Sequence, residues 1–552
     1  MNYKELQIFN YEVLLYKIVN WLGIIIKTLI FYIILSQIMS NTNSKKITSP
    51  LYSSIGVVLI SFLLLSHSCT LKNSKVEESL QLPNMIIFIA DDVSWDDLGC
   101  YGNKQVHTPN IDGLAEEGII FKNAYLTTSS CSPSRNSIIM GRYPHNTGAA
   151  ELHTSPPVEM ISLPEILKSK GYFTLQAGKF HMGDYARRGF DQVHEDRKIN
   201  GLGGEGYWDQ AVDNLPDDQP FFMWLAAIDA HRDWGSNQFS GTHPPSTIKV
   251  PEYLIDGDET KQDLAHYYDE ITRFDYHIGS VVRKLKQKGI YENTLIIVMA
   301  DNGRPFPHSK TRVNDQGVKT PFIIHYPKLS TTKNKLSQSL ISAVDIAPTL
   351  VDLVGIDQVD HFQGVSFKNL ILKSEKKFRN YVFAEHNWHD YEAYERMVRN
   401  DRYMYIVNSR PQFAQRGPLD AINSTSYKEL KEAKLNGTIT KKQADIFEAP
   451  RQVEELYDLS IDPYQYNNLL LGDHIPSAYE ELKQKLKEWV ITTGDDLPEN
   501  ITLDWYYREP VNTEEKDING NNKSNRTHHH GIRGEMPGKA SMATKNNNKG
   551  PF

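Results

Sequence analysis

Five short apolar runs, separated by longer stretches with helical periodicity, constrain the fold of this chain more than any other feature of its sequence. They predict buried strands at residues 85–90, 172–178, 220–228, 294–300 and 320–326. Helices are expected between them, at 108–118, 163–170 and 263–288. Strands that alternate with helices imply an α/β fold with a doubly wound, mostly parallel sheet flanked by helices.

The pattern changes after about residue 375. Short apolar runs at 381–385 and 403–407 predict antiparallel strands, and residues 478–493 predict one amphipathic helix. After about residue 505 the chain is rich in Asn, Lys and Gly, a composition typical of disorder. The expected parts are an α/β domain at 84–375, a smaller α+β C-terminal subdomain with an antiparallel sheet at 376–505, and a disordered polar tail at 506–552.

Two apolar stretches precede the first expected strand. Residues 18–39 are numerous enough to span a bilayer, but Lys27 lies among them at a cost. Residues 55–65 are too few to span; they follow a basic pair and end near Cys69, as in the signal peptide of a lipidated protein. We therefore expect export to the periplasm or to the cell surface as a lipoprotein, with membrane contact through the signal or lipid anchor only.

Met39 begins a complete signal peptide by itself, so the residues before it are interpreted as an extension upstream of the true start. The alternative is an N-terminal transmembrane anchor. The expected leader parts are the extension or anchor at 1–38, the lipoprotein signal at 39–69 and a tether at 70–83.

Charge and cysteine content exclude some classes of function. Lys and Arg total 60 against 68 Asp and Glu, a formal charge of −8, which argues against a nucleic-acid partner. Three cysteines are too few to predict a disulfide framework, so each needs its own explanation.

Cys131 opens the segment Cys-Ser-Pro-Ser-Arg, which ends at Arg135. Cys131 alone has three readings: a small buried residue, a thiolate nucleophile beside Arg135, or a metal ligand, the last without supporting spacing. The segment resembles the signature of the type I sulfatases of the alkaline-phosphatase-like superfamily, in which this Cys is oxidised to formylglycine. The resemblance runs in order from about residue 84 to 469.

The resemblance implies a metal site. Asp91 and Asp92 end the first strand and match the family's paired aspartates, while Asp301 and Asn302 match the second half of the site. Capping of a helix is the plain alternative for the aspartate pair alone. With the group made from Cys131, these ligands form a hard oxygen cage, for which Ca²⁺ is expected and Mg²⁺ is the alternative.

The resemblance also assigns the catalytic side chains. Lys179 would contact sulfate and formylglycine, His181 would act as a base, and Arg135 would orient the nucleophile. His231 would bind sulfate and protonate the leaving oxygen, and Lys310 would bind sulfate and offset its charge. The implied nucleophile is a hydroxyl of hydrated formylglycine, which requires a formylglycine-generating or radical maturation enzyme as a partner.

The expected substrate is a sulfated carbohydrate, either an algal polysaccharide such as ulvan or a glycosaminoglycan. Early in the C-terminal subdomain, Trp388 could stack on a sugar while His386 and His389 bind its polar groups; packing against the core is the alternative. Arg396 and Arg399 are interpreted as ion-paired residues rather than as ligands of a second anion.

Three other functions stay open. The segment at 301–307 is similar to the sulfamidase-like branch, so an N-sulfoglucosamine sulfohydrolase acting on N-sulfate is one alternative. A formylglycine-dependent phosphodiesterase or phosphonate monoester hydrolase is the second. An exported carbohydrate-binding lipoprotein with a decayed site is the alternative that is not an enzyme.

Overall fold

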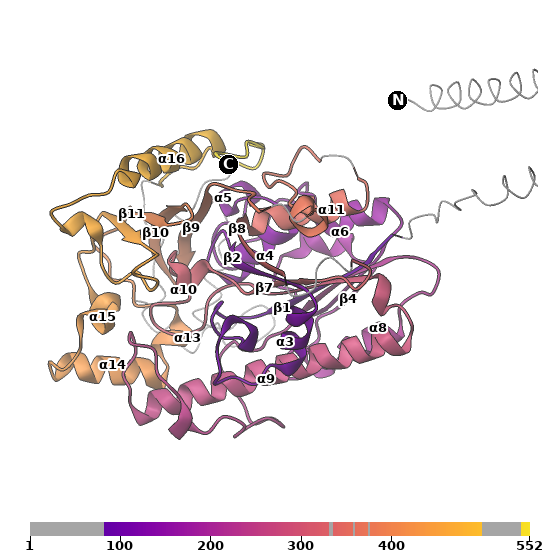
Figure 1. Ribbon diagram of the computed structural model, residues 1–552, viewed down its shortest axis with the longest axis horizontal. Coiled ribbons are helices and arrows are strands. Elements are labelled where there is room, and N and C mark those ends of the chain that lie inside the picture. The colour runs from indigo at the N-terminus through magenta and orange to yellow at the C-terminus, as the bar shows by residue number, and fades with distance from the viewer. Residues whose placement is uncertain (1–81, 330–334, 357–358, 374–375, 499–542) are drawn as a thin grey trace, which may run out of the picture. The chain divides into compact units, whose positions relative to one another are not determined.

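The computed structural model describes most of the chain beyond the leader (Figure 1). The expected extension or anchor at 1–38, the signal at 39–69, most of the tether at 70–83 and most of the polar tail lie outside the described residues. Within the described part, no helix combines the length and apolar character needed to cross a membrane. The described ranges are 82–329, 335–356, 359–373, 376–498 and 543–552.

Within these ranges, eight strands form one large sheet in the order β4-β3-β5-β1-β6-β7-β2-β8. Neighbours pair in parallel except around β7, which is antiparallel to both β6 and β2. The expected doubly wound, mostly parallel sheet is confirmed. The strands are β1 (Asn84–Ala90), β2 (Ile119–Tyr125), β3 (Phe173–Gly178), β4 (Gln192–His194), β5 (Phe221–Ala226), β6 (Thr294–Ala300), β7 (Phe322–His325) and β8 (Lys335–Ser342).

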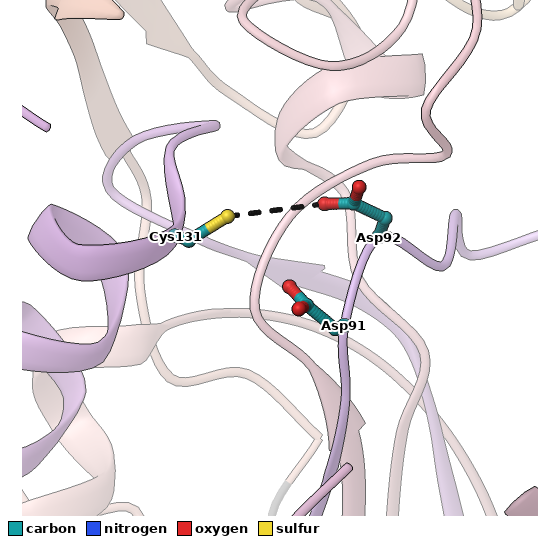
Figure 2. A group of neighbouring side chains, drawn as sticks. All are labelled: Asp91, Asp92 and Cys131. Atoms are coloured by element: carbon teal, nitrogen blue, oxygen red, sulfur yellow. Dashed lines mark hydrogen bonds between the residues drawn. The ribbon is translucent and has the colours of Figure 1, made fainter. Parts of the chain in front are cut away.

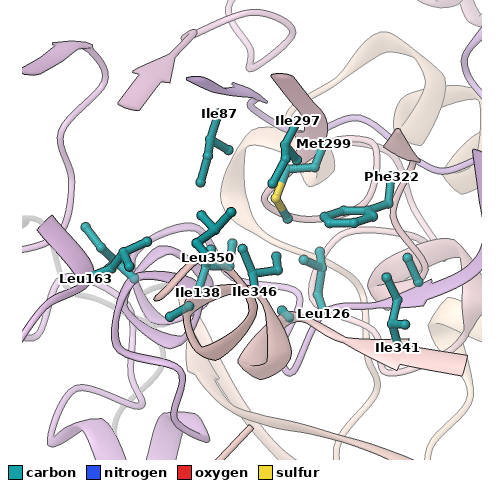
Figure 3. Close-up of a cluster of buried hydrophobic side chains, with 14 of the residues drawn as sticks. Ile87, Leu126, Ile138, Leu163, Ile297, Met299, Phe322, Ile341, Ile346 and Leu350 are labelled. Atoms are coloured by element: carbon teal, nitrogen blue, oxygen red, sulfur yellow. The ribbon is translucent and has the colours of Figure 1, made fainter. Parts of the chain in front are cut away.

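Helices cover both faces of this sheet (Figure 1). Alternate residues of the central strand β1 face opposite layers, so one strand contributes to two cores. Ile87 packs in the cluster that includes Ile138 and Leu350 (Figure 3), whereas Phe88 packs against Trp208 on the other face. The first face carries α4 (Cys131–Met140), α6 (Leu163–Ser169) and α11 (Ile346–Leu353); the second carries α3 (Pro109–Glu116), α8 (Trp208–Asp213) and α9 (Asp258–Gln287).

Helix α9 starts five residues before its predicted beginning at 263. Acidic residues fill its first turn and Lys284 and Lys286 its last, a distribution that complements the helix dipole. Gly289 follows its end with a φ of 70° and allows the chain to turn away. The apolar periodicity predicted the helix, but its first turn is polar and carries no apolar residue that would have extended the prediction.

In the described C-terminal region, four strands form a separate antiparallel sheet in the order β12-β11-β10-β9. Trp489 of α16 stacks on Phe383 of β9, with centroids 5.3 Å apart. The expected antiparallel sheet is confirmed, but β9 runs through residues 386–389, which the sequence left outside a strand. The elements are β9 (Val382–His389), β10 (Tyr391–Arg399), β11 (Tyr403–Asn408), β12 (Glu454–Asp458) and α16 (Ala478–Thr493).

The remaining α-helices of the described residues lie in the segments that connect the strands. Two of them, α7 and α13, border the site described below. They are α5 (Pro144–Thr147), α7 (Arg197–Asn200), α10 (Asp315–Val318), α12 (Lys368–Leu372), α13 (Leu419–Ile422), α14 (Thr425–Leu435) and α15 (Lys441–Ala444).

The last ten residues pack on the protein, which corrects the expected disordered tail for 543–552. Arg142 donates from Nη2 to the carbonyl oxygens of Thr544 and Asn546, at 2.9 and 2.8 Å, and from Nη1 to Oδ1 of Asn547 at 2.7 Å. Arg142 is buried, so its guanidinium needs these acceptors. The polar composition predicted disorder because such a segment has little apolar area to bury. Composition does not show that the segment can supply hydrogen-bond acceptors to a buried donor elsewhere in the chain.

Candidate active site

Two neighbouring parallel strands deliver the predicted acidic cluster. Asp91 and Asp92 follow β1, and Asp301 and Asn302 follow β6, with Ala90 paired to residue 300 at the ends of the strands. The backbone N–H of Asp92 donates to Oδ1 of Asp301 at 3.2 Å. Parallel pairing therefore brings side chains more than 200 positions apart to one edge of the sheet, where α/β proteins place their sites.

Cys131 lies at the first turn of α4 and faces this cluster (Figure 2). Its Sγ is 3.9 Å from Oδ1 of Asp92, and both lie close to a carboxylate oxygen of Asp91. Burial raises the pKa of the Cys131 thiol well above its ordinary value, although Lys179 and Lys310 act to lower it. The unmodified side chain is thus a protonated thiol, which disfavours the thiolate-nucleophile reading.

The three carboxylates differ in charge. Burial would raise the pKa of Asp91, but Lys179 and His231 outweigh it and hold that pKa well below its ordinary value. Burial raises the pKa of Asp92 to about 7 despite Lys310. Burial, assisted by the charge of Asp91, likewise raises the pKa of Asp301 to about 7. The cluster therefore shares protons near neutral pH and would release them to a cation.

A divalent cation fits this cluster by the chemistry of its donors. Oδ1 of Asp91 and Oδ1 of Asn302 are buried without a hydrogen-bond partner among the described residues. Buried oxygen atoms without partners are costly, and carboxylate and amide oxygens are the ligands that Ca²⁺ and Mg²⁺ prefer. The residues that would hold the ion are Asp91, Asp92, Asp301 and Asn302.

Two predicted cations neutralise the cluster from one side. Arg135 donates from Nε to Oδ2 of Asp301 at 2.7 Å, and Lys179 forms a salt bridge with Asp91. Gly178 sets the position of Lys179: its φ is 92°, and a Cβ there would lie 2.0 Å from the carbonyl oxygen of Ala226. The close approach of β3 and β5 thus requires glycine immediately before the lysine.

Lys310 approaches from the other side and is fully buried. Its Nζ donates to Oδ2 of Asp92 at 2.7 Å and to Oδ2 of Asp420 at 2.8 Å. Burial would lower the pKa of Lys310, but these two carboxylates raise it well above its ordinary value. The predicted sulfate-binding lysine is therefore held between two acids, one of which the sequence did not single out.

The two predicted histidines are neutral in this arrangement. Burial, followed by the charge of Lys310, lowers the pKa of His231 to about 4; its Nε2 lies 3.5 Å from Oδ2 of Asp420. Burial, followed by Lys179, lowers the pKa of His181 well below its ordinary value. Nε2 of His181 lies 2.9 Å from Nδ1 of His153, a second residue that no sequence motif indicated.

The three C-terminal residues predicted to bind sugar lie on β9 with different surroundings. His389 lines the cavity described below, and its Nδ1 is 2.8 Å from Oγ of Ser130. Trp388 is 3% exposed and packs beside Cys131, so it presents no open ring face for stacking. His386 is fully buried and does not line the cavity.

Arg396 and Arg399 were interpreted as ion-paired residues, and the structure shows them paired with Asp495 and Asp315. These ion pairs are buried and do not lie on the surface.

A cavity of about 470 Å³ opens over these groups. Four predicted catalytic residues line it, whereas the buried Arg135 and Lys310 are not among its lining residues. Nothing in the local sequence marks the other charged residues of the wall, because they come from loops and short helices. The lining includes the predicted Cys131, Lys179, His181, His231 and His389, and the unpredicted His153, Glu195, Arg197, Asp390 and Asp420.

Arg197 differs from the other cations of the wall. It is exposed at the start of α7 and has no acidic partner among the described residues. By contrast, Glu195 is paired with Arg187, Asp420 with Lys310, and Lys179 with Asp91. Arg197 therefore provides unneutralised positive charge at the cavity.

Comparison with known proteins agrees with this geometry. The sulfatase family matches residues 83–356, and the family described as N-sulphoglucosamine sulphohydrolase, C-terminal, matches 308–410. An ulvan-active sulfatase of Formosa agariphila is 30% identical over 455 residues, covering 79% of this chain and 85% of the relative. Human N-sulphoglucosamine sulphohydrolase is 26% identical over 468 residues, covering 75% of this chain and 90% of the relative.

Solved structures share the fold at lower identity. The Bacteroides fragilis protein YidJ aligns with a TM-score of 0.59 at 19% identity, over 76% of this chain and 97% of that one. BT4656, solved with D-glucosamine-2-N,6-O-disulfate, aligns with a TM-score of 0.56 at 19% identity, over 74% and 98%. The solved structures share the fold; the family match and the sequence relatives, together with the Cys131 signature beside the paired aspartates, show that the chain belongs to the sulfatase family and is a sulfatase.

Proposed function

We propose that this sulfatase removes sulfate esters from an anionic polysaccharide of the ulvan or glycosaminoglycan type. The observation that carries the proposal is the convergence of Cys131 with Asp91 and Asp92 beneath a cavity lined by Lys179 and His231. The relatives named for activity on ulvan and on N-sulphoglucosamine support the class of substrate.

Two groups not encoded directly by the sequence complete the site. We propose that Cys131 is converted to formylglycine and that Ca²⁺ occupies the acidic cluster, with Mg²⁺ as the alternative. When present, hydrated formylglycine supplies a hydroxyl nucleophile and the cation supplies positive charge for the sulfate oxygens.

The chain's own residues then have distinct tasks. Lys179, anchored by Asp91, offers its ammonium to the sulfate and offsets the charge that builds up during transfer. His231 is neutral in the free protein; an anionic substrate near its Nε2 favours its protonated form, which can donate to the leaving oxygen. His181 is neutral, and its Nδ1 has no hydrogen-bond partner among the described residues, so it can accept a proton there.

The cavity also favours a substrate with more than one negative group. A single sulfate is served by the charges around Cys131, whereas Arg197 adds an unpaired cation at the same cavity. We infer that Arg197 binds a carboxylate or second sulfate beside the ester that is cleaved. This suits a uronate-containing or multiply sulfated chain.

Cleavage of an N-sulfate is the second candidate. It is favoured by the match of residues 308–410 to the C-terminal family of N-sulphoglucosamine sulphohydrolase. A panel of defined N-sulfated and O-sulfated oligosaccharides, assayed for released sulfate, decides between them; exclusive release from N-sulfates would replace the ester proposal.

We also propose that the chain is exported and lipidated at Cys69, because residues 55–65 and the preceding basic pair form a lipoprotein-like signal. Cys69→Ala should then leave the protein without lipid label in cells fed a labelled fatty acid. Equal labelling of both forms would contradict lipidation at this residue.

The reaction centre is tested by changing Cys131 and measuring its modification. Cys131→Ala should abolish release of 4-methylumbelliferone from its sulfate ester while the circular dichroism spectrum and melting temperature stay close to wild type. Intact mass of the wild-type chain, co-expressed with a maturation enzyme, should show the loss expected for oxidation of the thiol to an aldehyde. Retained turnover by the alanine variant would overturn the assignment of the nucleophile.

A further inference from the structure

A second cavity, of about 520 Å³, lies next to the loops that carry the acidic cluster. Trp95 is three positions after Asp92, Arg304 is two after Asn302, and both line this cavity. Among the described residues, none lines both this cavity and the catalytic one. The remaining lining residues are Asp96, segments 101–105 and 249–252, Tyr268, Tyr464 and Tyr466.

Aromatic side chains form much of the wall. The rings of Tyr464 and Tyr466 stack with centroids 5.9 Å apart and planes inclined by 24°. Tyr464 is 36% exposed, and Trp95 is partly exposed. Rings that are both apolar and bordered by polar groups are suited to the C–H faces and hydroxyls of a sugar.

The acidic residues of this cavity are already neutralised. Asp96 pairs with Arg304, whose Nη2 also lies 2.9 Å from Oδ1 of Asp97. Glu252 pairs with Lys442. A cationic ligand would therefore have to compete with existing ion pairs, because none of these carboxylates is free to bind it.

Cations and donors, in contrast, are left without partners. Lys104 and Lys249 are exposed on the wall, and neither has an acidic partner among the described residues. Nε of Arg304 and Nε1 of Trp95 are buried donors without an acceptor in the described part of the chain. A ligand rich in acceptor oxygens and negative charge would satisfy both kinds of group.

The two lysines stand on segments that are tied together. Oε1 of Gln105 accepts a hydrogen bond from the backbone N–H of Lys249, and Nε2 of Gln105 lies 3.5 Å from the carbonyl oxygen of Lys249. The spacing of Lys104 and Lys249 is therefore largely set before a ligand arrives, which lowers the entropic cost of binding.

We propose that this cavity is a second binding site, separate from the catalytic one, for an anionic oligosaccharide: a stretch of sulfated or uronate-bearing sugar chain. This ligand is of the same anionic polysaccharide class as the substrate under "Proposed function", and the choice of that class rests on the proposed function. Binding at the second site would hold a polymer on the enzyme between cleavage events and would leave small sulfate esters unaffected.

Binding is measured first, without turnover, in full-length protein carrying Cys131→Ala. Affinity gel electrophoresis and calorimetry with ulvan fragments compare this protein with versions that also carry Lys104→Ala and Lys249→Ala. We expect affinity to fall by at least about fivefold, as the loss of roughly 1 kcal/mol implies. The matched control is Lys170→Ala with Lys431→Ala, two exposed lysines outside both cavities.

Tyr464→Ala changes no charge and should also weaken binding, whereas ulvan stripped of sulfate and carboxylate should not bind detectably. The site is refuted if the lysine pair binds as tightly as its control pair, or if the control pair loses as much affinity. Equal binding of the neutral polymer would refute an anionic ligand.

Kinetics with an intact Cys131 separate this site from the proposed function. The Lys104 and Lys249 double variant should keep its kcat/KM on 4-methylumbelliferyl sulfate within about twofold and show a several-fold higher KM on polymer. Loss of activity on the small ester would refute a separate site. A wild-type chain that cleaves no sulfate ester would refute the proposed function, while the binding comparison would still decide the second site.

Discussion

Replacing Arg197 with alanine tests how the catalytic cavity recognises its substrate. The guanidinium is exposed, lines the cavity and has no acidic partner among the described residues, so its removal leaves no buried charge behind. The helix start should survive the change, because the side chain of Asp196 caps α7 through the backbone N–H of Lys198 at 2.9 Å. Any loss of activity therefore reports on contact with the substrate rather than on folding.

The expected magnitude follows from the exposure of the group. A hydrogen bond to a charged partner contributes about 1.5–3 kcal/mol, and solvent screening at an exposed site reduces this to about 1–2 kcal/mol. Because each 1.4 kcal/mol is about a factor of ten, kcat/KM should fall by about 5- to 30-fold. The loss should shrink in high salt, where exposed charges are screened.

The assay compares two substrates in the same preparations. Arg197→Ala should lose activity on a uronate-containing or multiply sulfated oligosaccharide and keep it on 4-methylumbelliferyl sulfate, which has no second anion. Lys198→Ala removes the neighbouring exposed cation, which does not line the cavity, and serves as the control. Equal losses on both substrates, or a loss no larger than that of the control, would refute the assigned role of Arg197.

Three further outcomes are expected. Burial raises the pKa of Asp92 from its ordinary 3.8 to about 7. In the window between these two pH values, the folded metal-free protein keeps a proton on Asp92 that the unfolded chain has lost. Its stability should fall as pH rises through the window, and added Ca²⁺ should raise the melting temperature more at pH 8 than at pH 5; equal shifts would contradict the ligand assignment. Arg396→Ala should lower the free energy of unfolding, measured by chemical denaturation, by about 3–5 kcal/mol, because it leaves the buried carboxylate of Asp495 without its partner. KM for the aryl sulfate, measured by steady-state kinetics, should not change. Deleting 543–552 removes acceptors from the buried Arg142 and should cost about 2–4 kcal/mol in the same denaturation assay, so an unchanged midpoint would show that the docking is not stabilising.

Local sequence was sufficient for the class of sheet, for five of its eight described strands and for the residues of the proposed reaction centre, whereas β2, β4 and β8 were not predicted. The apolar run that became β1 has no polar residue between Met85 and Ala90, and a short run of this kind is typical of a strand that is buried on both faces of a parallel sheet. The acidic residues that follow β1 and β6 then meet at one edge, whatever the loops do. Cys131 was identified by a short contiguous signature, which is a property of sequence alone.

The exposure of the C-terminal residues did not follow from local sequence. The sequence analysis predicted contact of Trp388 and His386 with a sugar, but β9 continues through both residues and pairs with β10, which buries them. Continuation of a strand depends on the register of its partner, and 386–389 carries no apolar alternation that predicts it. Packing, not residue type, decided the exposure of these side chains.

By itself, the sequence determined the α/β fold class, the acidic cluster and the position of the cysteine for which we propose modification, because each depends on residues that are adjacent in the chain or on strand ends fixed by parallel pairing. Only the tertiary structure placed Asp420 against Lys310, left Arg197 without a partner, and docked 543–552 on Arg142. The two contacts, at Lys310 and at Arg142, join segments about 100 to 400 positions apart, and no local pattern encodes which distant group will satisfy a buried charge.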